Sequence, residues 1–328
     1  MKTVLFYARE AGVASMIAAL EEPFLDAGFR LFYDVAGDAA DILRGGAPWK
    51  VSDLNVAICG YDDPILDRTG DFLSKIAGLM PTLGLLDSWK GVDRFWYSDG
   101  RLRQLTDRLI VPDEGVRNYL LARGVPFDWP VVAGHPGLEC MRGFSTGKRK
   151  LMRKEARSVL GLSEYVPVLL VLSEPFRLPD GNRLSLLDAR VVNGESVKDW
   201  LDDIYANDYR IALRLHPLEH YKVPFGWIDA GNVGFDLALA AADRVIGLGS
   251  TTLAYAVAYG LDVQCLDNQV VGWVPEFSDI PTELWDGLIS LGIFQNDPNR
   301  LDSHLPNLDL NDSSHRILAE VERLVISP

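Results

Sequence analysis

The stretch of sequence that most constrains the fold is Arg244-Val245-Ile246-Gly247-Leu248-Gly249-Ser250-Thr251-Thr252. Its first five residues have the pattern of a buried strand in a parallel sheet, with the apolar run Val245-Ile246-Gly247-Leu248 after Arg244. Gly249 then permits a tight turn and a close approach of a ligand to the backbone. Ser250, Thr251 and Thr252 supply hydroxyls, and the helix that follows offers N–H groups that have no partner within the helix. Together with the helix dipole, these groups predict an anion site at residues 249–252.

A second strand end supports this prediction. The predicted strand Tyr209–Leu215 runs into Arg214-Leu215-His216-Pro217. Because the carboxyl ends of parallel strands share one edge of a sheet, we expect Arg214 or His216 near the glycine loop. A cation beside a helix N-terminus suits a diphosphate. The alternative is that the loop is an ordinary helix cap and that His216 is a loop residue bonded to backbone.

Two common nucleotide-binding motifs are absent from the sequence. No lysine follows the glycines, so the loop is not the P-loop of an ATPase. The first strand-to-helix turn, Tyr7-Ala8-Arg9-Glu10-Ala11-Gly12, lacks the glycine fingerprint of NAD-binding domains.

Short β-branched runs alternate with longer helical patterns along the chain, which predicts α/β domains with parallel sheets covered on both faces. We expect one domain over residues 1–145 and a second over residues 146–310. An amphipathic helix, Ser313–Ile326, follows in residues 311–328. The segment that connects the two predicted α/β domains is basic, and we interpret it as a solvated linker helix rather than a phosphate contact. Its basic residues are Lys148, Arg149, Lys150, Arg153, Lys154 and Arg157.

Composition narrows the class of protein. The 328 residues include 32 Lys and Arg against 46 Asp and Glu, a net charge of −14, which repels a nucleic-acid backbone and gains nothing from anionic lipid. Cys59, Cys140 and Cys265 lie far apart, so neither a disulfide framework nor a zinc site is indicated. No run approaches the roughly 20 apolar residues of a membrane span, and the first apolar run is too short for a signal peptide. We therefore expect a cytoplasmic protein with no metal, no nucleic-acid partner and no transmembrane segment.

Several short segments have a familiar pattern: Asp107–Asp113, Gly124–Pro126, Val131–Leu138, Arg214–Pro217 and Ala242–Gly247 with Ser250–Thr252. Through them the chain resembles, over nearly its whole length, the GT-B fold of nucleotide-sugar enzymes. It is similar to bacterial polysaccharide-biosynthesis proteins, including capsule glycosyltransferases and the UDP-N-acetylglucosamine 2-epimerase group. The resemblance implies two Rossmann-like domains that face each other across a cleft, with the acceptor on the first, the nucleotide on the second and the last helix crossing back to the first.

The sequence also departs from that pattern. Many GT-B transferases place a glutamate in the helix after the phosphate loop, where it binds the donor ribose. Here that helix reads Leu253-Ala254-Tyr255-Ala256-Val257, so the resemblance places Tyr255 at the nucleoside. The acidic and histidine motifs of the epimerase group are not found in the first half, which favours a transferase over an epimerase.

The resemblance implies further site residues. Asp87 is the first choice for a general base and Glu10 the second, because each follows a predicted strand of the first domain; an N-cap or loop carboxylate is the alternative for both. His135 is a candidate for substrate contact or for a hinge, and Glu174 for contact with the donor sugar or phosphate. A metal is not required if helix N–H groups and Arg214 stabilise the leaving diphosphate.

The main hypothesis is a glycosyltransferase of surface-polysaccharide synthesis. It uses a nucleotide-sugar as co-substrate, a glycan or lipid-linked acceptor, and no other cofactor. Two alternatives stay open: a nucleotide-sugar epimerase or hydrolase on the same fold, and a catalytically silent binding protein that keeps the fold.

Overall fold

The chain forms two compact units. The computed structural model describes residues 2–43, 49–61, 68–87, 95–96, 100–103, 106–177, 183–191, 193–216, 219, 221–248, 251–266, 270–271 and 312–326. Unit 1 contains Met1–Cys140 and the C-terminal helix, and unit 2 begins at Met141. The predicted domain boundary after residue 145 lies a few residues beyond this division.

Unit 1 is built on a six-stranded parallel sheet with the order β2-β1-β3-β4-β5-β6. Successive residues of β1 point to opposite faces, and both faces are buried: Val4 and Phe6 belong to one core cluster, Leu5 and Tyr7 to the other. The strands are β1 (Thr3–Ala8), β2 (Arg30–Val35), β3 (Val56–Gly60), β4 (Thr82–Leu85), β5 (Arg108–Val111) and β6 (Pro130–Val132).

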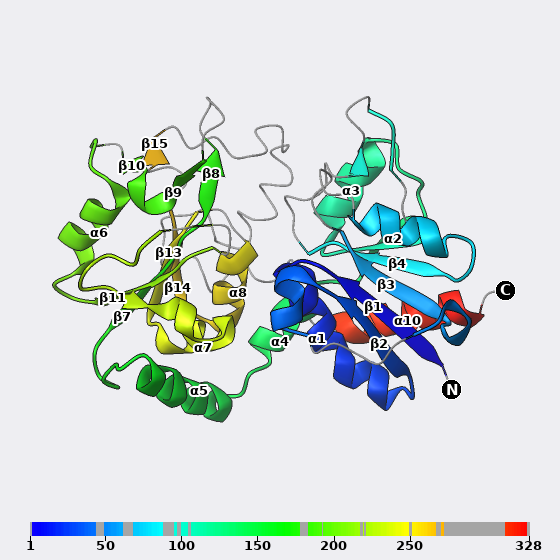
Figure 1. The fold of residues 1–328 in the computed structure, drawn as a ribbon, viewed down its shortest axis with the longest axis horizontal. Helices are drawn as coiled ribbons and strands as arrows, with labels where there is room; N and C mark the ends of the chain where they lie inside the picture. Colours follow the sequence, from blue (N-terminus) through cyan, green and yellow to red (C-terminus); the bar gives the residue numbers. More distant parts are fainter. Residues whose placement is uncertain are drawn as a thin grey trace. The chain divides into compact units, whose positions relative to one another are not determined.

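Helices cover the two faces of this sheet (Figure 1). On one face α1 (Ala11–Asp26) packs beside the C-terminal helix α10 (Ser313–Ile326), and Ile317 and Val321 of α10 are fully buried in the core beneath α1. On the other face α2 (Arg68–Ile76) contributes Phe72, Leu73 and Ile76. The remaining helices are α3 (Glu114–Ala122) and α4 (Pro136–Arg142), with the short 3-10 segments η1 (Gly37–Asp41) and η2 (Val51–Asp53). The final helix therefore belongs to unit 1, as the resemblance implied.

Unit 2 is built on a five-stranded parallel sheet with the order β12-β11-β7-β13-β14. One face is covered by α6 (Val197–Tyr205), through Val197, Leu201 and Tyr205. The strands are β7 (Val168–Leu172), β11 (Arg210–Arg214), β12 (Ile228–Asp229), β13 (Arg244–Gly247) and β14 (Asp262–Cys265). The other helices are α5 (Thr146–Val159), α7 (Phe235–Ala241) and α8 (Thr251–Tyr259), with η4 (Leu186–Asp188) and η5 (Ala230–Asn232). The structure confirms the predicted α/β class with two Rossmann-like units.

Two antiparallel pairs in unit 2 were not predicted. One pairs β8 (Pro175–Arg177) with β9 (Arg183–Ser185), and the other pairs β10 (Arg190–Val191) with β15 (Val270–Val271). Each strand is only two or three residues long, which is too short for an alternating pattern to stand out in sequence.

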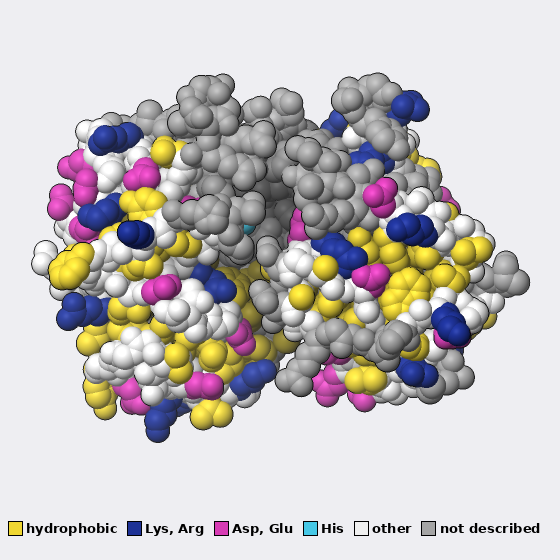
Figure 2. All heavy atoms as spheres, viewed as in Figure 1, with side chains coloured by type: hydrophobic (Ala, Val, Ile, Leu, Met, Phe, Trp, Pro, Cys, Tyr) yellow, Lys and Arg dark blue, Asp and Glu magenta, His cyan; other side chains and the backbone are white. Residues whose placement is uncertain are grey.

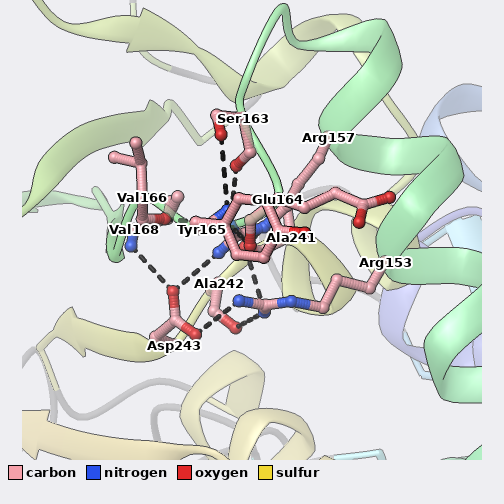
Figure 3. A network of polar contacts seen from close by, with 10 residues as sticks. All are labelled: Arg153, Arg157, Ser163, Glu164, Tyr165, Val166, Val168, Ala241, Ala242 and Asp243. Carbon is pink, nitrogen blue, oxygen red and sulfur yellow. Dashed lines mark hydrogen bonds and ion pairs between the residues drawn. The ribbon is translucent and has the colours of Figure 1, made fainter.

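The basic segment is part of unit 2. Its interpretation as a solvated linker was wrong for its three arginines, Arg149, Arg153 and Arg157, whose guanidinium groups donate to backbone carbonyls of unit 2. Figure 3 shows that Arg153 and Arg157, on α5, both reach Asp243, the residue before β13. The Nη2 atoms of these arginines lie 2.5 Å and 2.7 Å from the two carboxylate oxygens of Asp243. Arg157 also donates to the carbonyls of Ala241, Ser163, Glu164 and Val166. Spacing alone could not show which side chains of a basic helix turn inward.

Charges of both signs are mixed over the described surface in the view of Figure 2, where dark blue and magenta side chains alternate with apolar ones. Within the described part of the chain, no helix is long and apolar enough to cross a membrane.

Candidate functional site

The order of strands in unit 2 marks one place on the sheet for a ligand. The chain runs from β7 outward to β11 and β12, and then returns to β13 on the other side of β7. In an open parallel sheet, ligands bind outside the carboxyl ends of the strands where this reversal occurs. The reversal lies between β7 and β13, so the candidate site comprises the ends of these two strands and the start of α8.

The junction of β13 and α8 is closely packed. A Cβ on Gly247 would lie 3.0 Å from the Leu172 carbonyl oxygen and 3.2 Å from a methyl carbon of Leu253, so a larger residue would push α8 away from β7. The helix begins at Thr251, and Thr251 and Thr252 are partly exposed, while the rest of α8 is buried. The predicted phosphate-loop residues Gly249 and Ser250 lie outside the described residues. The two threonines therefore stand at a helix N-terminus beside the point of reversal, where the dipole favours an anion.

The end of β7 supplies Ser173 and Glu174 to the same edge. Ser173 is buried, with 6% of its surface exposed, and its N–H continues the ladder by donating to the Arg214 carbonyl at 3.0 Å. Glu174, the predicted donor contact, is partly exposed directly after it. Since β7 lies between β11 and β13, Ser173 and Glu174 occupy the middle of the edge that the sequence predicted from its two flanking strands.

His216 follows β11 at this edge, and a glutamate that sequence reasoning missed contacts its backbone. The His216 N–H donates to Oε2 of Glu219 at 2.9 Å, and Oε1 of Glu219 accepts from the Ser173 hydroxyl at 2.9 Å. The only signal in the sequence is the three-residue spacing from His216, which is common to many turns.

Arg214, which was predicted to clamp a diphosphate, makes contacts within unit 2. Its Nη1 donates to the carbonyls of Ala230 and Val233 at 3.0 Å and 2.7 Å, and its guanidinium lies 5.8 Å from the Phe235 ring centre. Burial lowers the pKa of this arginine, and Asp236 and Asp229 nearby oppose that shift. In this structure Arg214 holds the segment that leads into α7.

Tyr255, which the resemblance placed at the nucleoside, lies within α8 with 5% of its surface exposed. Its ring packs edge-on against Phe235, with the ring centres 6.0 Å apart. Tyr255 is therefore a core residue of unit 2.

The sheet of unit 1 has its own reversal point, between β1 and β3. The chain runs from β1 outward to β2 and then returns to β3 on the other side of β1. Glu10 follows β1 at the N-cap position of α1, and its side chain makes no capping hydrogen bond. Asp87 follows β4 and is buried with 8% exposure. A Cβ on Gly12 would lie 2.0 Å from Oδ2 of Asp87, so this carboxylate rests against the first turn of α1. A helix N-terminus stabilises a carboxylate in that position.

His135 is tied to Asp87 and is fully buried. Its Nδ1 accepts from the Leu138 N–H at 3.3 Å, so Nε2 carries the proton and donates to the Asp87 carbonyl oxygen, 3.3 Å away. Burial lowers the pKa of His135 to about 4, although the hydrogen bond to Asp87 opposes the shift. The imidazole is therefore neutral near pH 7 and links the end of β4 to the start of α4.

Arg9 and Asp34, which sequence reasoning also missed, pair at the same edge of unit 1. Nη2 of Arg9 lies 2.7 Å from Oδ1 of Asp34, and the guanidinium stacks over the Tyr7 ring at 4.2 Å. Arg9 directly follows β1, and Asp34 lies near the end of the neighbouring strand β2. In the sequence, these places at two strand ends were the signal that could have identified the pair. Among the described residues no group of three or more His, Cys, Asp or Glu side chains is arranged to hold a metal ion.

No protein-family model matches the chain, and no curated protein matches its sequence. Solved structures share its fold. The wall teichoic acid polymerase TagF superposes with a TM-score of 0.60 at 14% identity, over 99% of this chain and 89% of the other. UDP-GlcNAc 2-epimerases superpose as well. That of Neisseria meningitidis, bound to UDP-GlcNAc, gives a TM-score of 0.58 at 11% identity, over 98% of this chain and all of the other. The epimerase of Methanocaldococcus jannaschii gives a TM-score of 0.59 at 11% identity, over 98% of this chain and 100% of the other. These similarities confirm the expected GT-B fold.

Proposed function

We propose that the protein is a glycosyltransferase that takes a nucleotide-activated sugar and transfers the sugar to a glycan or lipid-linked acceptor in surface-polysaccharide synthesis in the cytoplasm. The observation that carries the proposal is the reversal point of the unit 2 sheet. There the N-terminus of α8, with Thr251 and Thr252, stands beside Ser173 and Glu174, and the His216 turn follows the next strand.

The chemistry of this edge suits a leaving diphosphate. Helix N–H groups and hydroxyls are donors that stabilise the charge that develops as the sugar departs. We propose Ser250, His216 and the two threonines as its contacts. Arg214 contributes through the segment that it holds rather than by direct contact. In unit 1 we propose Asp87 as the base that accepts the acceptor hydroxyl proton, with Glu10 as the second choice.

The folds of the similar proteins support nucleotide-activated substrates. TagF is a wall teichoic acid polymerase, and the Neisseria enzyme is bound to UDP-GlcNAc. A second candidate, a nucleotide-sugar epimerase, is favoured by one observation: the two epimerases are covered completely by this chain, whereas TagF is covered over 89% of its length.

A turnover panel separates the candidates. The purified chain is incubated with UDP-, GDP-, CMP- and dTDP-linked sugars, with and without glycan acceptors. A transferase releases the nucleotide only when acceptor is present, a hydrolase releases it without acceptor, and an epimerase returns the nucleotide-sugar with one inverted carbon. No turnover and no thermal stabilisation by any nucleotide would contradict both enzyme proposals and favour the silent binding protein.

Variants locate the activity. We expect His216→Ala and Ser250→Ala to weaken nucleotide binding with little change in melting temperature. The matched control is His315→Ala, because this histidine is exposed on α10 of unit 1. Equal losses in the control and in His216→Ala would show that the proposed site is misplaced.

A further inference from the structure

The Glu219 carboxylate joins the ends of two neighbouring strands in unit 2. Oε1 accepts from the hydroxyl of Ser173, after β7, and Oε2 accepts from the backbone N–H of His216, after β11; both distances are 2.9 Å. The Glu219 N–H in turn donates to the His216 carbonyl oxygen at 2.8 Å. Glu219 therefore closes the same turn twice, with its side chain at the His216 N–H and with its backbone at the His216 carbonyl.

The Glu219 bridge connects the His216 turn to the strand that borders the candidate site. β7 is the strand that borders the reversal point, whereas β11 is one strand further away. The strand ladder also connects β11 to the end of β7, since the Ser173 N–H donates to the Arg214 carbonyl. The carboxylate adds a side-chain connection beyond the ladder and fixes the backbone of His216 relative to Ser173.

The hydrogen bonds also suit a carboxylate in particular. Both oxygens accept, and a hydrogen bond to an ionised acceptor is about twice as strong as one between neutral groups. Glutamine keeps one acceptor oxygen for the His216 N–H, and its NH2 group can donate to the Ser173 hydroxyl oxygen, but neither contact is then made to an ionised oxygen. Alanine has no polar side-chain atom for either contact.

We propose that Glu219 is a positioning residue of the nucleotide site: it holds the His216 turn against Ser173 so that the His216 side chain meets the nucleotide diphosphate. This rests on the proposed function, because it assumes that His216 contacts that ligand. Glu219 acts through His216 and does not itself touch the phosphate.

A double-mutant cycle tests the proposal. UDP, CDP, GDP and dTDP are each titrated by calorimetry into the wild-type chain to find the tightest ligand. That ligand is then titrated into Glu219→Ala, Glu219→Gln, His216→Ala and the double variant Glu219→Ala with His216→Ala. The expected loss for Glu219→Ala is on the order of tenfold in Kd, equivalent to about 1.4 kcal/mol. Glu219→Gln should recover part of it.

The cycle distinguishes positioning from simple structural support. If Glu219 acts through His216, the double variant binds no more weakly than His216→Ala alone, because the two residues share one interaction with the ligand. Additive losses would overturn the proposal, as would a Glu219→Ala chain that binds like the wild type. If Glu219→Ala does not fold, Ser173→Ala replaces it, since it removes one of the two donors; it should weaken binding in the wild-type background and not in His216→Ala. A wild-type chain that binds none of the four nucleotides contradicts the proposed function itself.

Discussion

Asp243 is an ion-pair residue whose removal should destabilise unit 2. Its carboxylate accepts from Arg153 Nη2 at 2.5 Å, from Arg157 Nη2 at 2.7 Å and from the Val168 N–H at 2.8 Å (Figure 3). The Arg157 side chain is only 1% exposed, whereas the side chains of Arg153 and Asp243 are about one third exposed. Asp243→Ala would leave a buried guanidinium without its counter-ion and the first amide of β7 without its acceptor.

The magnitude follows from these contacts. Removing one partner of a buried ion pair costs about 3–5 kcal/mol, and an unpaired buried amide adds about 1–3 kcal/mol. Two features reduce this. Four backbone carbonyls still hold Arg157, and the exposed part of the site lets water replace some of the lost bonds. We expect a net loss of about 3 kcal/mol, which corresponds to a fall of roughly 6–12 °C in the melting temperature of a unit of this size.

A matched variant makes the test specific. Asp262 is also an aspartate next to an arginine in the unit 2 sheet, but its pair with Arg244 is 3.2 Å long and both side chains are partly exposed. Asp262→Ala should cost less than about 1 kcal/mol. Native-state hydrogen exchange of the β7 amides reports the stability of unit 2 separately from that of unit 1. Equal losses in the two variants, or a loss below about 1 kcal/mol in Asp243→Ala, would refute the view that α5 is anchored through Asp243.

Three further outcomes are expected. Burial lowers the pKa of His135 from 6.5 to about 4 in the folded chain. The unfolded chain therefore binds more protons between pH 6.5 and pH 4, so the free energy of unfolding falls by up to about 3 kcal/mol as the pH drops through this range. His135→Asn should flatten this part of the curve of unfolding free energy against pH, and an unchanged curve would contradict the assignment. Gly12→Ala should displace the Asp87 carboxylate, because the added carbon would lie 2.0 Å from Oδ2; transfer activity should fall at least tenfold while nucleotide affinity on unit 2 is kept, and full activity would remove Asp87 from the proposed base role. Gly247→Ala should weaken nucleotide affinity by moving α8, since its Cβ would meet backbone at 3.0 Å; unaltered titration curves would show that the start of α8 is not part of the site.

Much of the fold could be predicted because local signals agree with the tertiary structure. The helix α10 has the predicted bounds, Ser313–Ile326. Gly28, Gly124 and Gly260 follow helices in left-handed conformations, with φ of 80°, 86° and 88°, where glycine is favoured. Parallel strands buried on both faces read as continuous apolar runs, and they did so here for β1, β7 and β13.

The candidate site was predicted less completely, because its residues meet only through the order of strands. The sequence placed Arg214 and His216 beside the glycine loop, but it could not show that β7 lies between them and brings Ser173 to the middle of the edge. Nor could it show that Arg214 turns to the carbonyls of Ala230 and Val233, or that Glu219 reaches back to His216. These depend on which way each side chain leaves its strand, and residue type does not determine that.

On the proposed function, a nucleotide binds at the carboxyl ends of β7 and β13. Hydrogen exchange with and without saturating nucleoside diphosphate tests it most directly, since protection is read along the whole chain. We predict slowed exchange in peptides that cover the end of β7, the end of β11 with the His216 turn, and the junction of β13 with α8. Little change is expected in the β1 to β6 sheet of unit 1. Protection confined to unit 1, or no protection with UDP, CDP, GDP or dTDP, would contradict the claim.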